Sequence, residues 1–114
     1  MRSPVVTDLA VSPDGKKAAA LANTLNKNWR VCVNGSVWDG SYDMAWKPVF
    51  CPNSDAVAAK VRKDGQYTVL VNGTAVGGEF DMCFDPIFNA DGSKVLVRAL
   101  HDGKALRIVA NVPK

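Results

Sequence analysis

The glycines of this 114-residue sequence constrain its fold more than any other feature. Seven of the nine follow Asp or Asn directly, and that pairing favours tight type I′ hairpin turns, in which both central residues have positive φ. The pairs are Asp14-Gly15, Asn34-Gly35, Asp39-Gly40, Asp64-Gly65, Asn72-Gly73, Asp91-Gly92 and Asp102-Gly103. Between them lie β-rich runs of ordinary strand length, for example 29–33, 67–71, 94–98 and 106–109. We therefore expect an all-β fold of short antiparallel strands.

The sequence also repeats itself at a step of 38 residues, with 13 identities in the 45 pairs that begin at positions 29 and 67. In this register Val31-Cys-Val-Asn-Gly35 aligns with Val69-Leu-Val-Asn-Gly73, and Trp46-Lys-Pro-Val-Phe50 aligns with Phe84-Asp-Pro-Ile-Phe88. An earlier unit fits with one extra residue. The alignment places the helix-prone run 16–22 over two strand-like runs, so it predicts a strand there despite the local helix propensity.

A period near 40 residues with four short strands per unit is typical of β-propeller blades. The units run approximately over 8–46, 47–84 and 85–114, and the third stops where its fourth strand should begin. Closed propellers have about four to eight blades, so about three blades per chain call for completion by a longer protein or by a second chain. We expect a homodimer that forms one ring of about six blades. Residues 4–7, from either chain, could supply the missing strand, and a monomeric open arrangement stays an alternative.

Specific phrases in the repeat resemble a known group of proteins. The segment Val11-Ser-Pro-Asp-Gly-Lys-Lys17, followed by small apolar residues, resembles the WD40-like repeats of TolB-type propellers, in which Phe-Ser-Pro-Asp-Gly-Lys recurs once per blade. The Asn-Gly-x-x-Trp element at 34–38 and the Trp-x-Pro-x-Phe element at 46–50 are similar to the tryptophan-rich cytoplasmic subunit of the Tmc transmembrane redox complex of anaerobic bacteria. This resemblance implies a cytoplasmic accessory subunit of a membrane-associated electron-transfer complex, without a cofactor of its own.

Charge and cysteine usage narrow the classes of function. The net charge of +3 is spread without a basic stripe, which argues against nucleic-acid binding. No apolar run approaches the roughly 20 residues of a spanning helix, so we expect no direct membrane insertion. The three cysteines form no Cys-x-x-Cys pair, and we interpret them as small buried hydrophobes in a reducing compartment such as the cytoplasm. We expect no metal and no cofactor.

Several residues are candidates for binding or for structure. Trp38 has only a valine as its counterpart in the repeat, which suits a partner contact or a sugar-stacking platform, with core packing as the alternative. The expected strand order brings two kinds of loop to one face, and these loops contain Trp46, Lys47, Phe84, Asp85, Lys63 and His101. Asp43 and Asp81 recur in an aromatic-Asp-Met motif, where we expect each to accept hydrogen bonds from loop backbone and to tie the units together. Asn34 and Asn72 are expected in hairpin turns.

Three classes of function remain open. A non-catalytic interaction scaffold fits the repeated units and the absence of a recognisable catalytic constellation. A ligand- or carbohydrate-binding propeller would use the converging loops and Trp38. A propeller enzyme is disfavoured because the expected inner-strand segments are mainly apolar and no motif places a nucleophile near His101, the sole histidine.

Overall fold

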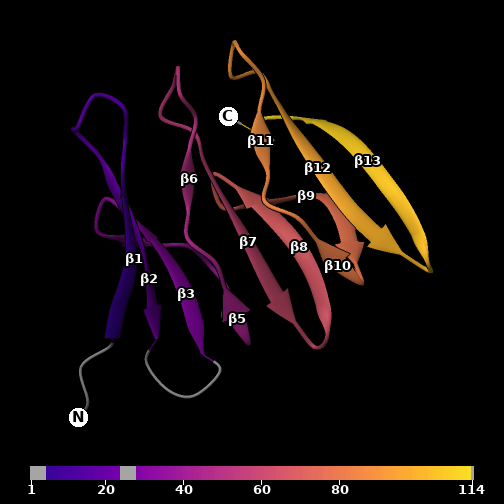
Figure 1. Cartoon of the computed structure of the whole chain (residues 1–114). Coiled ribbons are helices and arrows are strands. Elements are labelled where there is room, and N and C mark those ends of the chain that lie inside the picture. Colours follow the sequence, from indigo (N-terminus) through magenta and orange to yellow (C-terminus); the bar gives the residue numbers. More distant parts are fainter. Residues whose placement is uncertain (1–4, 24–27, 114) are drawn as a thin grey trace.

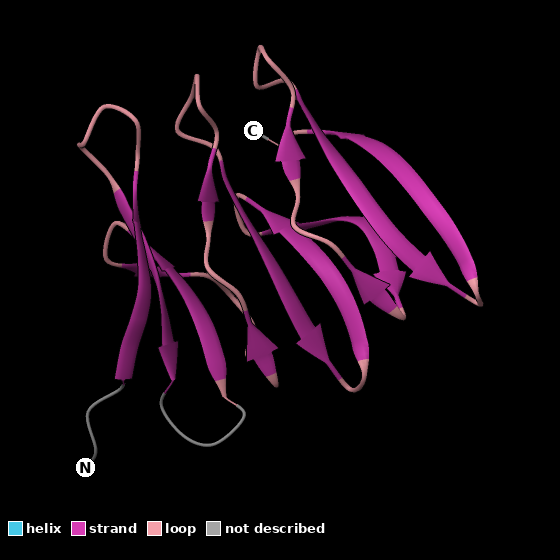
Figure 2. Ribbon diagram, viewed as in Figure 1, coloured by secondary structure: helices cyan, strands magenta, loops and turns pink. Residues whose placement is uncertain are grey.

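The computed structural model describes residues 5–23 and 28–113, and within these ranges the chain forms strands and no helix (Figures 1 and 2). The predicted all-β fold with antiparallel sheets is confirmed. Three sheets follow one another along the chain and lie side by side in sequence order. In the described part of the chain, no helical segment has the length and apolar character needed to cross a bilayer.

The first sheet has the strand order β1-β2-β3-β4. Its strands are β1 (Val5–Val11), β2 (Ala18–Asn23), β3 (Trp29–Val33) and β4 (Ser36–Val37). The helix-prone run is β2, so the strand predicted from the repeat is confirmed. Residues 5–7, considered above as a strand for the third unit, instead pair with β2 of their own sheet, and Pro4 lies outside the described residues.

The central and third sheets share one plan. The central sheet contains β5 (Met44–Ala45), β6 (Val49–Phe50), β7 (Val57–Lys63), β8 (Gln66–Val71) and β9 (Thr74–Phe80). The third contains β10 (Met82–Cys83), β11 (Ile87–Phe88), β12 (Lys94–His101) and β13 (Lys104–Asn111). β5 and β6 both pair with β7, and β10 and β11 both pair with β12, so each pair of short strands is one interrupted first strand. Among the described residues, β13 pairs on one side only, with β12.

Every first strand carries a bulge at the same repeat position. In β1 the register shifts between Thr7 and Ala10, and Asp8 within this bulge has a φ of 56°. In the other sheets the interruption falls at 46–48 and at 84–86. The bulge therefore places Asp8, Lys47 and Asp85 at equivalent points of the three sheets.

The Asp-Gly and Asn-Gly pairs form two kinds of turn. Both residues have positive φ in Asn34-Gly35, Asp64-Gly65, Asn72-Gly73 and Asp102-Gly103, as the type I′ prediction requires. In the other three pairs only the glycine has positive φ. Asp14-Gly15 and Asp91-Gly92 lie in longer hairpins, and Asp39-Gly40 lies in the connection between two sheets rather than in a hairpin.

Two hydrophobic clusters hold neighbouring sheets face to face. One joins Leu21 and Val31 of the first sheet to Ala59 and Val61 of the central sheet. The other joins Val69, Val71 and Phe80 of the central sheet to residues of the third sheet that include Val95, Val97 and Phe88. Because side chains alternate along a strand, the central sheet buries both of its faces and each outer sheet buries one.

Candidate interaction surfaces

The aromatic-Asp-Met motif marks the point where the chain passes from one sheet to the next. Tyr42 exchanges backbone hydrogen bonds with Trp29 of the first sheet, at 2.8 and 2.9 Å. The backbone N–H of Asp43 then donates to Arg62 of the central sheet at 2.9 Å. Met44 already belongs to β5, so the first strand of each following sheet begins before the boundary taken from the sequence repeat.

Both aspartates of this motif accept a hydrogen bond from a hairpin backbone. The Asp43 carboxylate accepts from the N–H of Asp64 at 2.9 Å, and the Asp81 carboxylate accepts from the N–H of Asp102 at 2.8 Å. The donor lies in the sheet that the chain is entering. Each aspartate thus fixes the start of a new sheet to the β7–β8 or β12–β13 turn of that same sheet.

Asn34 and Asn72 occupy the first turn position of their hairpins and extend the strand pairing with their side chains. The Asn34 side-chain oxygen accepts from the N–H of Ala18 at 3.3 Å, and the Asn72 oxygen accepts from the N–H of Val57 at 3.0 Å. The Asn72 side chain also donates to the carbonyl of Pro113 at 2.9 Å, which links the central sheet to the end of the third.

Trp38 is a contact between sheets rather than an open platform. Its side chain is half-buried and packs against the hydrophobic cluster between the first and central sheets. A Cβ atom at Gly73 would lie 3.6 Å from the indole ring, so the tryptophan rests on the Asn72-Gly73 turn of the neighbouring sheet.

Trp46, Lys47, Phe84 and Asp85 lie within the interrupted first strands and not in the loops between sheets, which corrects the expected placement. The reason is that Met44–Ala45 and Met82–Cys83, just before them, are already paired with β7 and β12. Lys47 is exposed, and its side chain forms no ion pair with any of the described residues. Trp46 and Asp85 take part in contacts between the central and third sheets, and Phe84 takes part in a contact at the open face of the third.

A lysine that the sequence did not single out organises one of these contacts. The Nζ atom of Lys60 lies 4.7 Å from the centre of the Trp46 ring and 3.3 Å from a carboxylate oxygen of Asp85 in the third sheet. The Lys60 side chain is only 13% exposed. The ring of Trp46 in turn lies 5.5 Å from the ring of Tyr67. This cluster joins the central and third sheets through an ion pair and a cation–π contact.

The third sheet repeats part of this cluster at its open face. Arg98, the repeat counterpart of Lys60, places its guanidinium 5.7 Å from the centre of the Phe84 ring, the counterpart of Trp46. Within the described ranges no carboxylate lies at ion-pair distance from Arg98. The signal that identifies this pair of sites is the 38-residue repeat, which aligns a lysine with an arginine.

Lys63 and His101 are repeat counterparts, and each ends the strand before a hairpin turn in a different sheet. Lys63 lines a cavity of about 370 Å³ with Tyr42, Gln66 and Glu79 among its other walls. The Nε2 atom of His101 lies 3.5 Å from a carboxylate oxygen of Asp102. The predicted site residues therefore do not converge on one pocket.

His101 belongs to a group of three possible metal ligands. One ligand atom each from Asp81, His101 and Asp102 lies within 4.8 Å of the others. The side chains of His101 and Asp102 are exposed, and a carboxylate oxygen of Asp81 is already engaged by the backbone N–H of Asp102. The turn offers fewer than the four protein ligands of a structural zinc site.

All three cysteines are free, with Cys51 and Cys83 buried and Cys32 half-buried. The interpretation as small buried hydrophobes is confirmed for the two buried cysteines. Burial raises the pKa of the Cys83 thiol, which keeps it protonated and unreactive near neutral pH.

Exposed apolar side chains gather on the two outer sheets. Of the nine large exposed hydrophobic residues that the described ranges contain, eight belong to the first or the third sheet. Those of the first sheet are Val6, Leu9, Val11 and Val37, and those of the third are Met82, Phe84, Ile87 and Val109. The central sheet contributes Met44 alone.

Residues at equivalent repeat positions show why these side chains are exposed. Val71 of the central sheet is 0% exposed, whereas its counterpart Val109 of the third sheet is 62% exposed. On the opposite side, Ala45 and Cys83 are 2% and 1% exposed, whereas their counterpart Val6 is 64% exposed. At these two positions the side chain is thus buried where two sheets pack and exposed where the stack ends.

Comparison with known proteins gives no relative for this chain: no family model, no curated protein and no solved structure matches it.

Proposed function

We propose that this chain is a non-catalytic interaction scaffold, built as three consecutive blades of a β-propeller, whose two outer faces bind further protein. Three antiparallel sheets with the same strand plan, each packed face to face on the next, support this architecture. In the third sheet, β10 and β11 correspond to β5 and β6 of the central sheet, β12 corresponds to β7, and β13 corresponds to β8, as the repeat implies.

The observation that carries the proposal is the pair of exposed outer faces. Soluble proteins seldom leave contiguous apolar patches of several hundred Å² in water, and such patches commonly mark binding surfaces. Here Val6 and Val109 of the outer sheets occupy positions that are buried in the internal interfaces. At these two positions the outer faces therefore have the side chains of an interface, which supports a protein partner there.

The recurring polar residues support a structural rather than a chemical role. Asp43, Asp81, Asn34 and Asn72 all bond backbone groups at the turns and at the crossings between sheets. The resemblance to the tryptophan-rich subunit of the Tmc complex makes an accessory role beside a membrane-associated redox complex, on the cytoplasmic side, the specific form of this proposal.

The cavity beside Lys63 favours ligand binding as a second candidate function. Its walls include the polar side chains of Gln66, Glu79 and Thr68. A sugar site built on Trp38 has less support, because this ring covers the turn at Gly73. Titration with a panel of glycans and small anions, compared between the native chain and Lys63→Ala, tests this candidate, and saturable binding that the substitution abolishes would support it.

Light scattering over a range of concentrations tests the scaffold proposal. We expect the chain to associate, and we expect Val6→Asp or Val109→Asp to weaken association, since each places a charge in one outer face. Gln66→Asp, at the exposed first residue of β8 in the central sheet, is the matched control and should leave association unchanged. A native chain that stays monomeric and binds no hydrophobic dye would contradict the proposal.

A further inference from the structure

We propose that the open face of the third sheet binds the open face of the first sheet of a second copy, with Arg98 paired to Asp8 of the partner subunit. This inference rests on the proposed function, and it identifies the protein that binds the outer faces, which the proposed function does not name. It follows from the contacts that the chain makes between its own sheets. We call the face of each sheet that points to the next sheet in chain order its forward face, and the opposite one its rear face.

The interface between the central and third sheets is the template. There Lys60 lies on the forward face of the central sheet and its Nζ atom is 3.3 Å from Asp85, in the first-strand bulge of the third sheet. The same Nζ atom lies over the ring of Trp46. A cation, an aromatic ring and a carboxylate from the following sheet therefore form one polar contact of this interface, in addition to the hydrogen bond from Asn72 to Pro113.

The forward face of the third sheet contains two of these three groups. Arg98 stands at the position of Lys60, and Phe84 stands at the position of Trp46. The missing group is the carboxylate from the bulge of a following sheet. The residue at that bulge position in the first sheet is Asp8, which is exposed and whose one described side-chain contact is a 3.3 Å hydrogen bond from the hydroxyl of Thr7.

The interface between the first and central sheets shows that this charge pattern is not a general property of the repeat. There the counterparts of Lys60 and Asp85 are Leu21, which is fully buried, and Lys47, which is exposed. An arginine and an aspartate thus meet only if the forward face of the third sheet is placed against the rear face of a first sheet.

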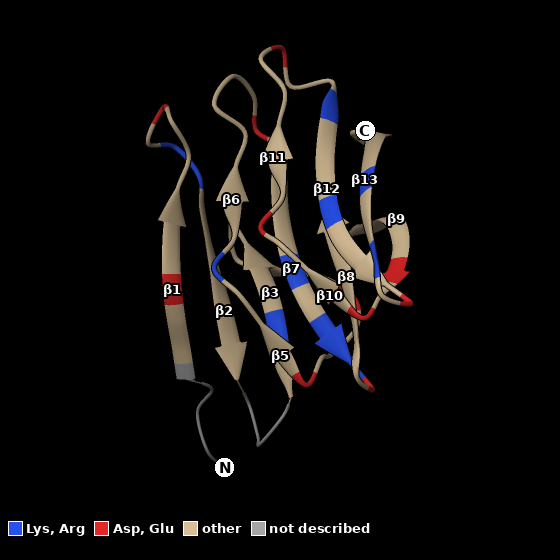
Figure 3. Ribbon diagram, turned by 45° about the vertical axis from the view of Figure 1, so that its right-hand side comes forward, with Lys and Arg blue, Asp and Glu red and all other residues tan. Residues whose placement is uncertain are grey.

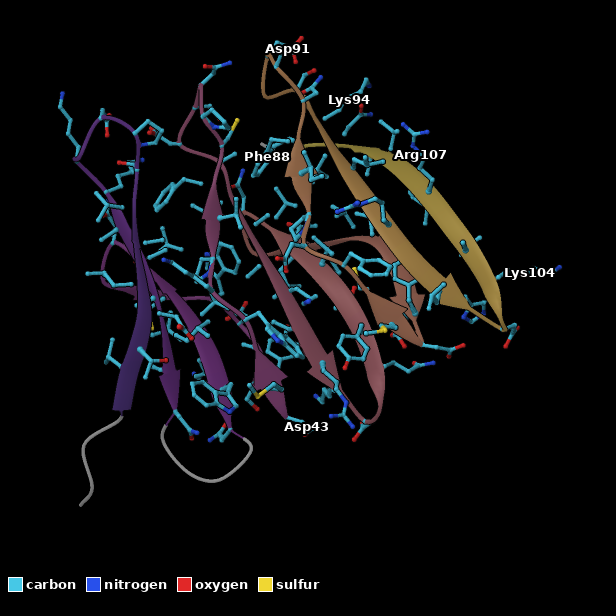
Figure 4. All side chains as sticks on the ribbon, viewed as in Figure 1. Asp43, Phe88, Asp91, Lys94, Lys104 and Arg107 are labelled. Atoms are coloured by element: carbon cyan, nitrogen blue, oxygen red, sulfur yellow. The ribbon has the colours of Figure 1, made fainter. Side chains whose placement is uncertain are left out.

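A second arginine, Arg107, lies beside Arg98, so a carboxylate placed here would offset two positive charges. Arg98 and Arg107 stand directly opposite each other on β12 and β13, an arrangement of like charges that destabilises a strand pair. Figure 3 shows positive bands on both strands and a negative band on β1, and in Figure 4 the labelled Arg107 extends from β13 into open space. A cavity of about 320 Å³, lined by Phe84, Ala105 and both arginines among others, lies at this place.

Most of the other residues on the two faces are apolar and match in the same register, whereas Lys94 and Asn111 on the forward face bond each other. Beside the arginines the forward face has Ile87, Leu96 and Val109, which the strand pairing aligns in one row. The rear face of the first sheet has the exposed Val6, Val11 and Val37, the half-buried Cys32, and Ala20 and Ala22, which their neighbours already bury; the exposed Arg30 lies on the same face, opposite Ala22. Their counterparts on the rear face of the central sheet include Ala45, Ala59, Val61 and Leu70, which are all buried against the first sheet.

Two copies are the number that closes such an arrangement. Each copy has one forward and one rear open face, so a head-to-tail contact either closes into a ring or continues as a filament. Propeller rings contain about four to eight blades, and six is the one multiple of three in that range. A dimer uses both open faces of both copies in two identical junctions.

Charge reversal tests the junction, with sedimentation velocity on the full 114-residue chain as the measurement. We expect Asp8→Arg alone and Arg98→Asp alone each to weaken the dimer by about tenfold or more, because each puts like charges at both junctions. The double variant should regain most of the native affinity. An equimolar mixture of the two single variants should also form dimers, because the mixed dimer has one native and one reversed pair.

The outcomes separate this inference from the proposed function. A native dimer whose affinity is unchanged in both single variants overturns the ion pair and leaves the scaffold standing. Association without rescue in the mixture, or a mass that grows without limit with concentration, overturns the closed head-to-tail dimer. A native chain that stays monomeric overturns the dimer, and it overturns the scaffold as well if it also binds no hydrophobic dye. Rescue in the mixture cannot come from misfolded variants, so it supports the junction directly.

Discussion

The carboxylate of Asp43 accepts a hydrogen bond of 2.9 Å from the backbone N–H of Asp64, and the residue before Asp43 is still paired with the preceding sheet. Two adjacent residues therefore belong to two sheets, and the aspartate holds the second sheet in place at its β7–β8 turn. The same relationship recurs at Asp81 and Asp102. This crossing sets the position of each sheet relative to the one before it.

Removal of the Asp43 carboxylate should loosen the central sheet. We expect Asp43→Ala to lower the free energy of unfolding by about 1 kcal/mol, since it replaces a charge-assisted hydrogen bond to the exposed N–H of Asp64 with one to water. Asp43→Asn keeps an acceptor oxygen and is the matched control, with a smaller loss. Urea unfolding measures the free energy, and amide hydrogen exchange at Asp64 should speed up in the alanine variant alone. Equal losses in both variants would contradict this role.

Two glycines with the same backbone conformation should respond differently to alanine. Gly15 and Gly92 have φ values of 74° and 75°, so each substitution costs about 1 kcal/mol for the left-handed backbone alone. At Gly92 the added Cβ would lie 2.9 Å from the Sγ of Cys51, whereas at Gly15 nothing lies within 4 Å.

We therefore expect Gly92→Ala to lower the unfolding midpoint in urea more than Gly15→Ala. In a double-mutant cycle, Cys51→Ala should recover part of the loss at Gly92 and none at Gly15, because only the first pair is in contact. Equal effects at the two glycines, with no coupling to Cys51, would show that the turn between β11 and β12 does not pack on Cys51, which follows β6.

The turn at Asp91 should respond to acid in a way that depends on Ser93. The hydroxyl of Ser93, at 2.6 Å, and then its backbone N–H lower the pKa of Asp91 below its ordinary value of 3.8. A folded-state pKa below the unfolded one adds stability above the unfolded value, and that stability is lost as the pH falls through the folded pKa.

The Ser93→Ala variant removes the largest cause of this shift. We expect NMR titration of the Asp91 carboxyl carbon to show its pKa moving up toward 3.8. The stability difference between native and variant chains should be greatest above about pH 4 and should narrow below it. Asp14, whose pKa is lowered first by the hydroxyl of Ser12, should keep its low pKa in this variant and is the internal control. A difference in stability that stays constant with pH would count against the linkage.

Trp38 should behave as a packing residue. We expect Trp38→Ala to cost about 2 kcal/mol in unfolding free energy, less than a fully buried tryptophan would, because the side chain is half-buried on the Gly73 turn. Trp38→Phe keeps a ring over the turn and should lose less. Chemical denaturation followed by circular dichroism measures both variants. An alanine variant as stable as the native chain would contradict the packing role and favour Trp38 as a binding residue.

The local features of the fold were predictable from sequence because their causes are local. An Asn-Gly or Asp-Gly pair between two β-rich runs specifies its own turn, so the hairpins at 34–35, 64–65, 72–73 and 102–103 follow from the backbone preferences of those residues. The strand at 18–23 was predictable only through the repeat, because its alanines favour a helix by themselves.

Features that depend on distant pairing were missed. The first strands begin at Met44 and Met82 because these residues pair with Arg62 and Leu100, and nothing near either methionine in sequence signals that pairing. Lys60 was overlooked for the same reason, because the Trp46 ring and the Asp85 carboxylate that it contacts come from segments before and after it in the chain. Whether Trp38 is covered depends on the next sheet, 35 residues further along at Gly73.

Sedimentation equilibrium of the native chain tests the central claim most directly, which is that the two open faces are halves of an interface. A single chain has a mass of 12.2 kDa. The account predicts twice this mass over a range of concentrations, falling to the single-chain value only on strong dilution or in Arg98→Asp. A mass of one chain at every concentration up to the solubility limit would contradict it.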